Sequence, residues 1–376
     1  MILYVSYRFE TDIGAQVNLN ILKEIYGEKN VFIADLRMLE AKTEENYVAF
    51  GKYHGKSERI LQWLQGNTMY ISDKTIRKIG LIITDKKVQL VFIEDSIFGN
   101  LAKYIKSKFP DVLVVAFYHD IAADLYRQKS EHSHSLLTKI ECSVAIRQER
   151  MQQRYNDVNI VFSQRDVALY QKYYQTAPDA VIPLSGEIPD HSDYYVSENN
   201  VNGAVKHILF VGTRYWPNIV GIRWFYQNVM PKLPDNMVLD VVGRGTEFLC
   251  EEFTDPRVVV HGTVDDVYQY YREADIVIAP LFDGGGMKTK TVEAISYGKC
   301  IVGTDEGLVG FWDEMDDSIR NKCVFLCNTA QEWIDAISKL AEKDICRFNF
   351  PLYDLFLRRF SYDAARKELS RVLKQV

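Results

Sequence analysis

The chain has 376 residues, of which 47% are hydrophobic and 26% charged, and its formal net charge is −6. One hydrophobic core rarely serves a chain of this length, so we expect two domains, each of under about 200 residues. The composition is typical of a soluble globular protein, and no apolar run approaches the roughly 20 residues of a membrane-spanning helix. The negative charge argues against general binding of nucleic acid.

The N-terminus and the cysteines predict a cytoplasmic protein. The first residues, MILYVSYRFETD, are apolar at once and then acidic, which is unlike a signal peptide and typical of a first core strand. Six cysteines are scattered along the chain without a CxxC pair or a Cys/His spacing typical of zinc. Cys323 and Cys327 lie four apart, which alone is a weak metal signal. We therefore expect reduced cysteines and no metal site.

The first half of the chain alternates apolar strands with helices. In several strands the apolar residues run on rather than alternate, which is typical of a parallel sheet covered on both faces. The alternation predicts a doubly wound α/β domain, with residues 40–85 mainly helical. The expected strands are 2–9, 30–36, 88–95, 112–120, 159–163 and 180–183, and the expected helices are 17–26, 58–64, 71–83, 100–109, 134–156 and 165–174.

Polar residues and a glycine follow these strands where ligands of parallel sheets bind. Gly14 follows the first strand, and it would either let the backbone approach a ligand or simply form the turn. His119 and Asp120 end one strand, and Glu94 and Asp95 end the strand before it. A histidine in this place either meets a substrate or makes one structural hydrogen bond, and the residues alone leave both alternatives open.

Positive charge is concentrated in residues 50–108, which hold 11 Lys and Arg against 5 Asp and Glu. A basic face on an otherwise acidic protein can dock on the anionic headgroups of a membrane. The alternative is that these charges lie on ordinary solvated helix faces.

A polar, turn-forming segment separates this half from a second α/β half. We interpret residues 185–205 as a linker, because they lack any periodicity. Asp265 and Ser361 are the expected N-caps of their helices. The expected strands are 207–211, 237–242, 257–260, 276–280, 300–304 and 324–327, and the expected helices are 218–229, 265–272, 287–297, 330–342 and a last helix from 361.

The stretch from Asp275 to Gly310 carries the strongest functional signal. Three glycines, Gly284, Gly285 and Gly286, separate a buried strand from a helix. A helix that opens out of glycines offers unpaired N–H groups and a positive dipole end to an anion. Lys288 and Lys290 add positive charge, and Glu293 offers an acceptor for hydroxyls. The pattern predicts a site for the diphosphate and ribose of a sugar nucleotide, whereas the plain alternative is an ordinary glycine turn.

The blocks of residues 206–312, FVGTRYWPN, LDVVGRG, VVVHGTVDD, GGGMKTKTVEA and EGLVG, resemble in order and spacing the nucleotide-binding half of group 1 (family four) glycosyltransferases. The first half resembles this family only loosely. The resemblance implies the GT-B fold, in which two Rossmann-like α/β domains face each other across a cleft. The implied domains are 1–184 and 206–357, joined by the linker 185–205, with a C-terminal helix 358–376 that crosses back to the first domain.

The resemblance also implies roles for single residues. Glu293 would bind the donor ribose, the backbone near Val264 would lie against the base, and His119 would contact the donor sugar. The first of two glutamates usual in the family falls on Gly285, and the usual lysine near Asn218 is missing, so Lys288 would bind the diphosphate with Arg214. The predicted catalytic residues are His119, Arg214 and Lys288, and the predicted donor-binding residues are Gly14, Arg214, Arg244, Val264, Gly284, Gly285, Gly286, Met287, Lys288, Lys290 and Glu293.

These residues predict a retaining glycosyltransferase that moves a sugar from a nucleoside diphosphate to an acceptor hydroxyl in polysaccharide or glycoconjugate assembly. It would need neither metal nor cofactor, because cations and N–H groups stabilise the departing diphosphate. A nucleotide-sugar epimerase and a non-catalytic partner subunit with the same fold stay open as alternatives. The expected partners are a nucleotide sugar, a glycan, lipid-linked or other acceptor and, through residues 50–108, the inner face of a membrane, but not nucleic acid.

Overall fold

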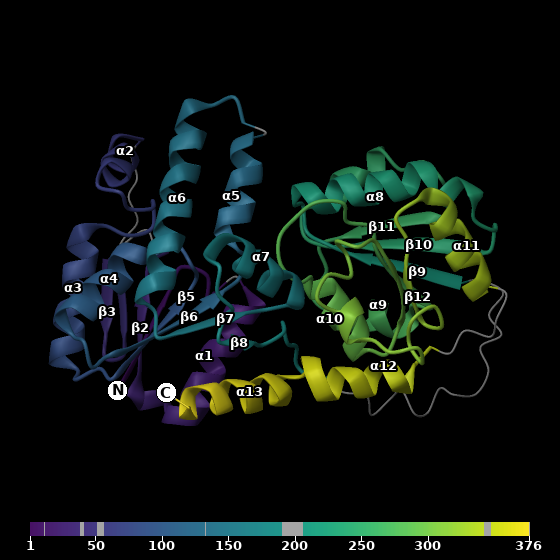
Figure 1. Ribbon diagram of the computed structural model, residues 1–376. Helices are drawn as coiled ribbons and strands as arrows, with labels where there is room; N and C mark the ends of the chain where they lie inside the picture. The colour runs from purple at the N-terminus through teal and green to yellow at the C-terminus, as the bar shows by residue number, and fades with distance from the viewer. Residues whose placement is uncertain are drawn as a thin grey trace. The chain divides into compact units, whose positions relative to one another are not determined.

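The computed structural model describes residues 1–10, 12–37, 41–50, 56–131, 133–189, 206–341 and 347–375. The chain forms two compact units, unit 1 (Met1–Pro183 and Arg366–Val376) and unit 2 (Leu184–Ala365). Both are α/β units with helices around a mainly parallel sheet, as Figure 1 shows, which confirms the predicted fold class. Most of the predicted linker, from 190 onward, lies outside the described residues. In the described parts, no helix is long and apolar enough to cross a membrane.

Unit 1 is built on an eight-stranded sheet with the order β3-β4-β2-β1-β5-β6-β7-β8. Among the described strands of this sheet, only the β3–β4 pair is antiparallel. The strands are β1 (Ile2–Ser6), β2 (Val31–Asp35), β3 (Ala41–Glu44), β4 (Tyr47–Phe50), β5 (Leu90–Glu94), β6 (Leu113–Tyr118), β7 (Val158–Val161) and β8 (Ala180–Val181). The helices are α1 (Ile13–Tyr26), α2 (Lys56–Leu64), α3 (Asp73–Asp85), α4 (Gly99–Lys108), α5 (Ala122–Glu131), α6 (Leu136–Tyr155) and α7 (Gln164–Tyr174).

The structure of unit 1 differs from the expected elements in three places. Residues 41–50 form the β3–β4 hairpin where helix was expected, because Val48 and its neighbours pair with β2, a contact that no local pattern reveals. The helix α5 was missed. The helix α1 begins at Ile13 instead of residue 17, since Asp12 caps it by accepting the N–H of Ala15.

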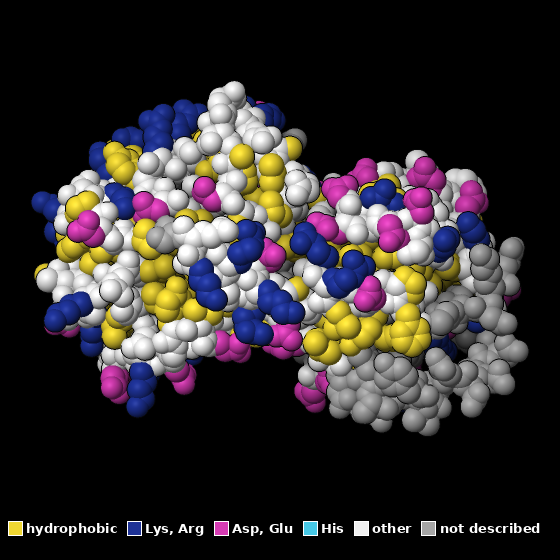
Figure 2. Space-filling view, turned by 60° about the horizontal axis from the view of Figure 1, so that its bottom comes forward, with side chains coloured by type: hydrophobic (Ala, Val, Ile, Leu, Met, Phe, Trp, Pro, Cys, Tyr) yellow, Lys and Arg dark blue, Asp and Glu magenta, His cyan; other side chains and the backbone are white. Residues whose placement is uncertain are grey.

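The helix α3 shows why the charges of residues 50–108 gather on a surface. Its isoleucines Ile76, Ile79 and Ile83 are buried, whereas three cations, Lys74, Arg77 and Lys78, lie on its exposed face. On the face shown in Figure 2, Lys and Arg side chains gather along one edge of unit 1. The helix is thus amphipathic with a basic outer side.

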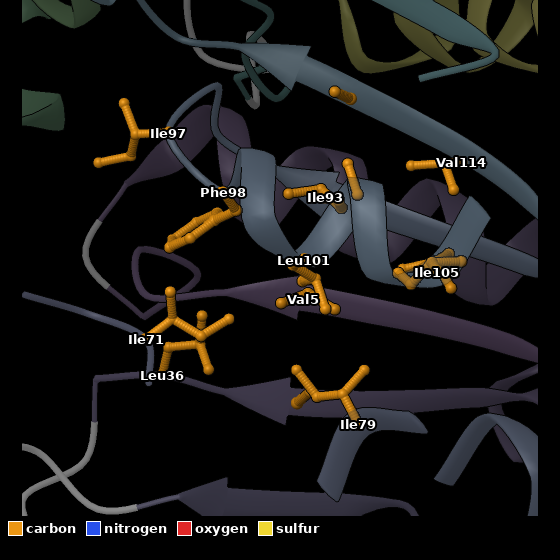
Figure 3. Close-up of a cluster of buried hydrophobic side chains, with 14 of the residues drawn as sticks. Val5, Leu36, Ile71, Ile79, Ile93, Ile97, Phe98, Leu101, Ile105 and Val114 are labelled. Atoms are coloured by element: carbon orange, nitrogen blue, oxygen red, sulfur yellow. The ribbon is translucent and has the colours of Figure 1, made fainter. Parts of the chain in front are cut away.

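The core beneath this helix joins strands and helices of unit 1. Figure 3 shows Val5, Ile93 and Val114, which come from β1, β5 and β6, in one cluster with Leu101 and Ile105 of α4. All five side chains are fully buried. Packing of this kind fixes the sheet and therefore the positions of the loops at its edge.

Unit 2 contains a six-stranded parallel sheet with the order β11-β10-β9-β12-β13-β14. The strand order reverses between β9 and β12, and in doubly wound sheets ligands bind at the carboxyl ends of the strands beside such a reversal. Its strands are β9 (Lys206–Val211), β10 (Met237–Val242), β11 (Val258–Gly262), β12 (Ile276–Ala279), β13 (Cys300–Gly303) and β14 (Val324–Leu326). Its helices are α8 (Trp216–Asn228), α9 (Tyr268–Glu273), α10 (Thr289–Ser296), α11 (Ala330–Ala341), α12 (Phe350–Leu355), a π-helical turn (Phe356–Phe360) and the start of α13 (Tyr362–Lys374).

Two predicted helix caps in unit 2 have different outcomes. Ser361 is confirmed, because its Oγ accepts the N–H of Ala364 at 3.2 Å. The N-cap predicted at Asp265 is wrong, since α9 begins only at Tyr268 with Val267 as its N-cap. The residues of α13 from Arg366 onward belong to unit 1, where Arg366 pairs with Glu24 of α1 at 3.7 Å.

Glycines let the helices and loops of unit 2 approach one another closely. A Cβ atom at Gly221 of α8 would lie 1.8 Å from the carbonyl oxygen of Pro280, just after β12. A Cβ at Gly243, where φ is 152°, would lie 2.0 Å from the carbonyl oxygen of Gly212. The close approach of α8 to the end of β12, and of the loop after β10 to the loop after β9, therefore requires that these positions lack side chains.

We predict that Gly221→Ala destabilises unit 2 by about 1–3 kcal/mol or more, because α8 must move away from Pro280. The apparent melting temperature and the urea midpoint measure this loss. Gly186→Ala is the matched control, since a Cβ there would lie 3.8 Å from the nearest atom, in the ring of Phe356, which is an ordinary van der Waals contact. Equal unfolding midpoints for Gly221→Ala and the parent protein would contradict the predicted overlap.

Candidate active site

The glycine turn of unit 2 lies between the end of β12 and the start of α10. Gly284 and Gly286 have φ values of 129° and 61°, which side chains other than glycine rarely allow. The carboxylate of Asp283 accepts the N–H of Gly284 at 2.7 Å and so shapes the turn. The helix begins at Thr289, two residues later than expected, with Lys288 as its N-cap. Met287 is buried, and its sulfur accepts the N–H of Leu184.

The side chain of Lys288 folds back over this turn. Its Nζ donates to the carbonyl oxygens of Gly285 at 3.0 Å and Gly286 at 2.8 Å, and it lies 2.6 Å from a carboxylate oxygen of Glu306. The loop that carries Glu306 is attached to α10, because Thr291 donates its hydroxyl to the carbonyl of Gly307. Sequence reasoning missed Glu306, which lies 18 residues from Lys288.

Lys290, by contrast, is buried without a carboxylate partner. The residue is only 8% exposed. Its Nζ donates a hydrogen bond to Oδ1 of Asn218 at 2.7 Å and lies 4.3 Å from the centre of the Phe210 ring. Within the described residues Lys290 forms no ion pair. Burial, together with the charge of Lys288, lowers the pKa of Lys290 to about 7, although the charge of Glu293 acts in the opposite direction.

Glu293 lies one turn after Lys290 on α10, on the same side of the helix. Its Oε2 accepts the hydroxyl of Tyr271 at 2.8 Å. Tyr271 is fully buried and stacks on Tyr297, with ring centres 4.7 Å apart. Burial raises the pKa of Glu293, while the hydroxyl of Tyr271 and the charge of Lys290 act in the opposite direction. The carboxylate is thus held in one orientation.

The loops after β9, β10 and β11 hold the remaining predicted residues of unit 2. Arg214 and Arg244 are both exposed, and the N–H of Arg214 donates to the carbonyl of Arg244 at 2.9 Å. The Arg214 guanidinium lies 4.6 Å from the centre of the Phe248 ring. Val264 is half-buried and follows a threonine whose N–H and hydroxyl both bind one carboxylate oxygen of Glu247.

In unit 1, His119 is part of a buried polar network at the end of β6. Its Nε2 lies 2.6 Å from Oε1 of Glu94, which also accepts from Asn18 at 2.8 Å, and its Nδ1 lies 3.5 Å from Asp12. Burial lowers the pKa of His119, but Asp12 and Glu94 outweigh this effect and raise it. His119 and Glu94, which follow or end neighbouring strands, are therefore in direct contact. Gly14 lies in the first turn of α1 rather than in the preceding loop.

A second polar group at this edge was missed by sequence reasoning. Arg8 donates to a carboxylate oxygen of Asp95 at 2.9 Å, and Tyr7 donates to the same oxygen at 2.6 Å. Nearby, Oδ1 of Asp120 is buried and has no hydrogen-bond partner among the described residues. Burial raises the pKa of Asp120 to about 6, although Arg8 and His119 act in the opposite direction. Arginine in a loop has no local signature that predicts such a pairing.

We predict that Tyr271→Phe destabilises the protein by about 1.5–3 kcal/mol, because the charged carboxylate of Glu293 loses its donor. The loss is expected to be larger at about pH 8 than at about pH 5, since the hydroxyl favours the ionised carboxylate. Thermal unfolding at both pH values measures it. Tyr268→Phe, on the same helix, serves as the control, and equal losses for the two variants would contradict the role of Tyr271.

Comparisons with known proteins bear on the family and the fold. Residues 205–343 match the family model of the glycosyl transferases group 1. No curated protein sequence matches the chain significantly.

Solved structures match the chain over its whole length. Sucrose-phosphate synthase from Thermosynechococcus elongatus shares 14% identity with a TM-score of 0.72, over 100% of this chain and 98% of that one. Anabaena HepE in complex with UDP shares 15% identity with a TM-score of 0.68, over 100% of both chains. The E. coli trehalose-6-phosphate protein bound with UDP-2-fluoro glucose shares 11% identity with a TM-score of 0.62, over 100% of this chain and 99% of that one.

At such identities the structural likeness concerns the fold, and the family model adds the activity. Together they confirm the expected family and the expected transfer of a glycosyl group. Residues 205–343 thus match the group 1 glycosyl transferases, and the protein is a glycosyltransferase with two parallel-sheet α/β domains of the GT-B type.

Proposed function

We propose that the protein transfers a sugar from a nucleoside diphosphate donor to an acceptor hydroxyl, with retention of configuration at the anomeric carbon. The observation that carries the proposal is Lys290. A buried ammonium beside a neutral amide is costly unless an anion joins it. The glycine turn and the N-terminus of α10 lie next to it in the chain, and both favour a phosphate.

UDP is the nucleotide that we propose for the donor. Two of the similar structures were solved with UDP or with a UDP sugar, which supports this choice. In the proposed complex Glu293, oriented by Tyr271, accepts the ribose hydroxyls, and the backbone near Val264 lies against the base. Arg214 and Arg244 add positive charge for the phosphates.

The two lysines have different proposed roles. Lys290 meets the diphosphate directly, because its Nζ is held by the neutral amide of Asn218 and forms no ion pair within the described residues. Lys288 first has to leave Glu306 and the carbonyl oxygens of the turn. The N–H groups from Gly284 to Met287 then contact the donor phosphates and sugar.

In the reaction, the bond between the anomeric carbon and the β-phosphate oxygen breaks, and the acceptor oxygen bonds to that carbon on the same face. The acceptor proton passes to the departing phosphate oxygen. Lys288, Lys290 and Arg214 stabilise the charge that develops on the diphosphate, without a metal ion. His119 donates a hydrogen bond to the donor sugar.

Unit 1 is the proposed binding site of the acceptor, which is a glycan or a lipid-linked precursor in polysaccharide or glycoconjugate assembly. Its polar edge around His119 and Asp120 offers donors and acceptors suited to sugar hydroxyls. We further propose that the protein is cytoplasmic and contacts the inner face of a membrane through the basic region 50–108, where 11 cations face 5 acids.

The affinity for UDP is expected to fall about tenfold between about pH 6 and pH 8. Lys290 has a pKa of about 7 in the protein without ligand, and it binds the diphosphate as an ammonium. As the pH rises above that value, the fraction of protein with protonated Lys290 falls, and the affinity for UDP falls with it. Titration calorimetry with UDP measures this dependence.

Two lysine variants separate this effect from the titration of UDP itself. Lys290→Met should bind UDP weakly and lose the protein's share of the pH dependence. Lys288→Met should keep that dependence but move it to higher pH, because the charge of Lys288 lowers the pKa of Lys290. The same affinity and pH profile in Lys290→Met and the parent would refute the assignment.

His119→Ala is expected to lower the turnover about 10- to 100-fold and to leave the affinity for UDP within about twofold, because it removes one charge-assisted hydrogen bond. Release of UDP, from the UDP sugar that the parent protein uses fastest, measures turnover. Glu94→Gln is the companion variant, since Glu94 raises the pKa of His119 and its loss should shift the rate profile to lower pH. Unchanged turnover in His119→Ala would return this histidine to a structural role.

A further inference from the structure

The helix α2 turns apolar side chains toward solvent. Ile60, Leu61 and Leu64 are exposed, Leu64 to 80%, while Gln62 and Trp63 on the other side are buried. A surface helix of a globular protein normally has the opposite arrangement, with leucines on the core side. Its outer face is therefore suited to an apolar partner.

The outer end of α6 has the same property. Leu136, Leu137 and Ile140 are exposed, Leu136 to 72%, whereas burial in this helix begins at Cys142. Figure 1 shows α5 and α6 side by side as a helical hairpin that projects beyond the sheet of unit 1. Three large apolar side chains exposed together at such a tip are typical of a surface that binds a partner.

The helix α2 packs beside α6. The side-chain amide of Gln148 on α6 donates to the carbonyl of Gly66, just after α2. The next residue, Asn67, accepts from Asn100 at the start of α4, which follows the carboxyl end of β5. The surface thus lies at the same edge of the sheet as His119, where parallel sheets bind their ligands.

Cations lie among these leucines. Arg59 on α2 and Lys139 and Arg147 on α6 are exposed, and a Cβ at Gly66 would lie 3.8 Å from the Arg147 guanidinium. Leucines interspersed with Lys and Arg are typical of helices that lie in a membrane interface, with apolar side chains below the headgroups and cations among the anionic phosphates. A second copy of this acidic chain would offer less to these cations than an anionic lipid surface does.

We propose that unit 1 docks on an anionic lipid surface through this apolar rim, formed by Ile60, Leu61, Leu64, Leu136, Leu137 and Ile140. The inference rests on the proposed membrane contact and moves it from the broad basic region 50–108 to α2 and the tip of α6. The exposed face of α3, with Lys74, Arg77 and Lys78, then adds only long-range attraction.

Co-sedimentation with vesicles tests the proposal. The parent protein should pellet with vesicles of phosphatidylcholine and phosphatidylglycerol in a ratio of about 7 to 3, and not with phosphatidylcholine alone. The double variants Leu61→Glu/Leu64→Glu and Leu136→Glu/Leu137→Glu should each weaken binding at least about tenfold. Their affinity for UDP should stay that of the parent, so loss of docking and loss of donor binding are distinguishable.

Leu81→Glu is the matched control, because Leu81 is 71% exposed on the basic face of α3. It should bind vesicles as the parent does. The proposal is overturned if the parent does not pellet with the anionic vesicles, or if Leu81→Glu alone weakens binding. It is equally overturned if light scattering shows a dimer that the double variants dissociate, since the rim would then bind a second copy.

Discussion

The contact between Lys290 and Asn218 is the interaction on which the site of unit 2 depends. It joins the start of α8, which follows β9, to the first turn of α10, which follows β12. These strands are the neighbours at which the strand order reverses. Burying an ammonium there costs stability that a neutral amide and one aromatic ring offset only in part. An anion bound beside Lys290 would remove this free-energy cost.

The close approach of the surrounding backbone makes this contact possible. Gly221 lets α8 lie against Pro280, and Gly243 lets the loops after β9 and β10 meet. The positive φ angles of Gly284 and Gly286 turn the chain out of β12 without a side chain in front of α10. The glycines thus serve the approach of backbone to backbone and, in the proposed complex, the approach of backbone to phosphate.

The sequence reveals most of this framework because its signals are local. Continuous apolar strands and glycine turns at strand ends predict the parallel sheets, and the helix after Gly286 differs from the expectation by two residues at its start. What the sequence does not reveal depends on distant partners. The hairpin β3–β4 forms because β4 pairs with β2, and Lys288 is held by Glu306 from another loop. Likewise, nothing in the pattern GMKTK distinguishes the paired Lys288 from the buried Lys290.

The two units also handle charge in opposite ways, which bears on what each can bind. In unit 1 the imidazole of His119 lies between the carboxylates of Glu94 and Asp12, so its positive charge is already balanced and a neutral hydroxyl is the ligand that disturbs it least. In unit 2 Lys290 forms no ion pair within the described residues, and only the more distant carboxylate of Glu293 acts on its charge, so a ligand that brings negative charge gains most there. The two units therefore favour ligands of different charge, a neutral hydroxyl at His119 in unit 1 and an anion at Lys290 in unit 2.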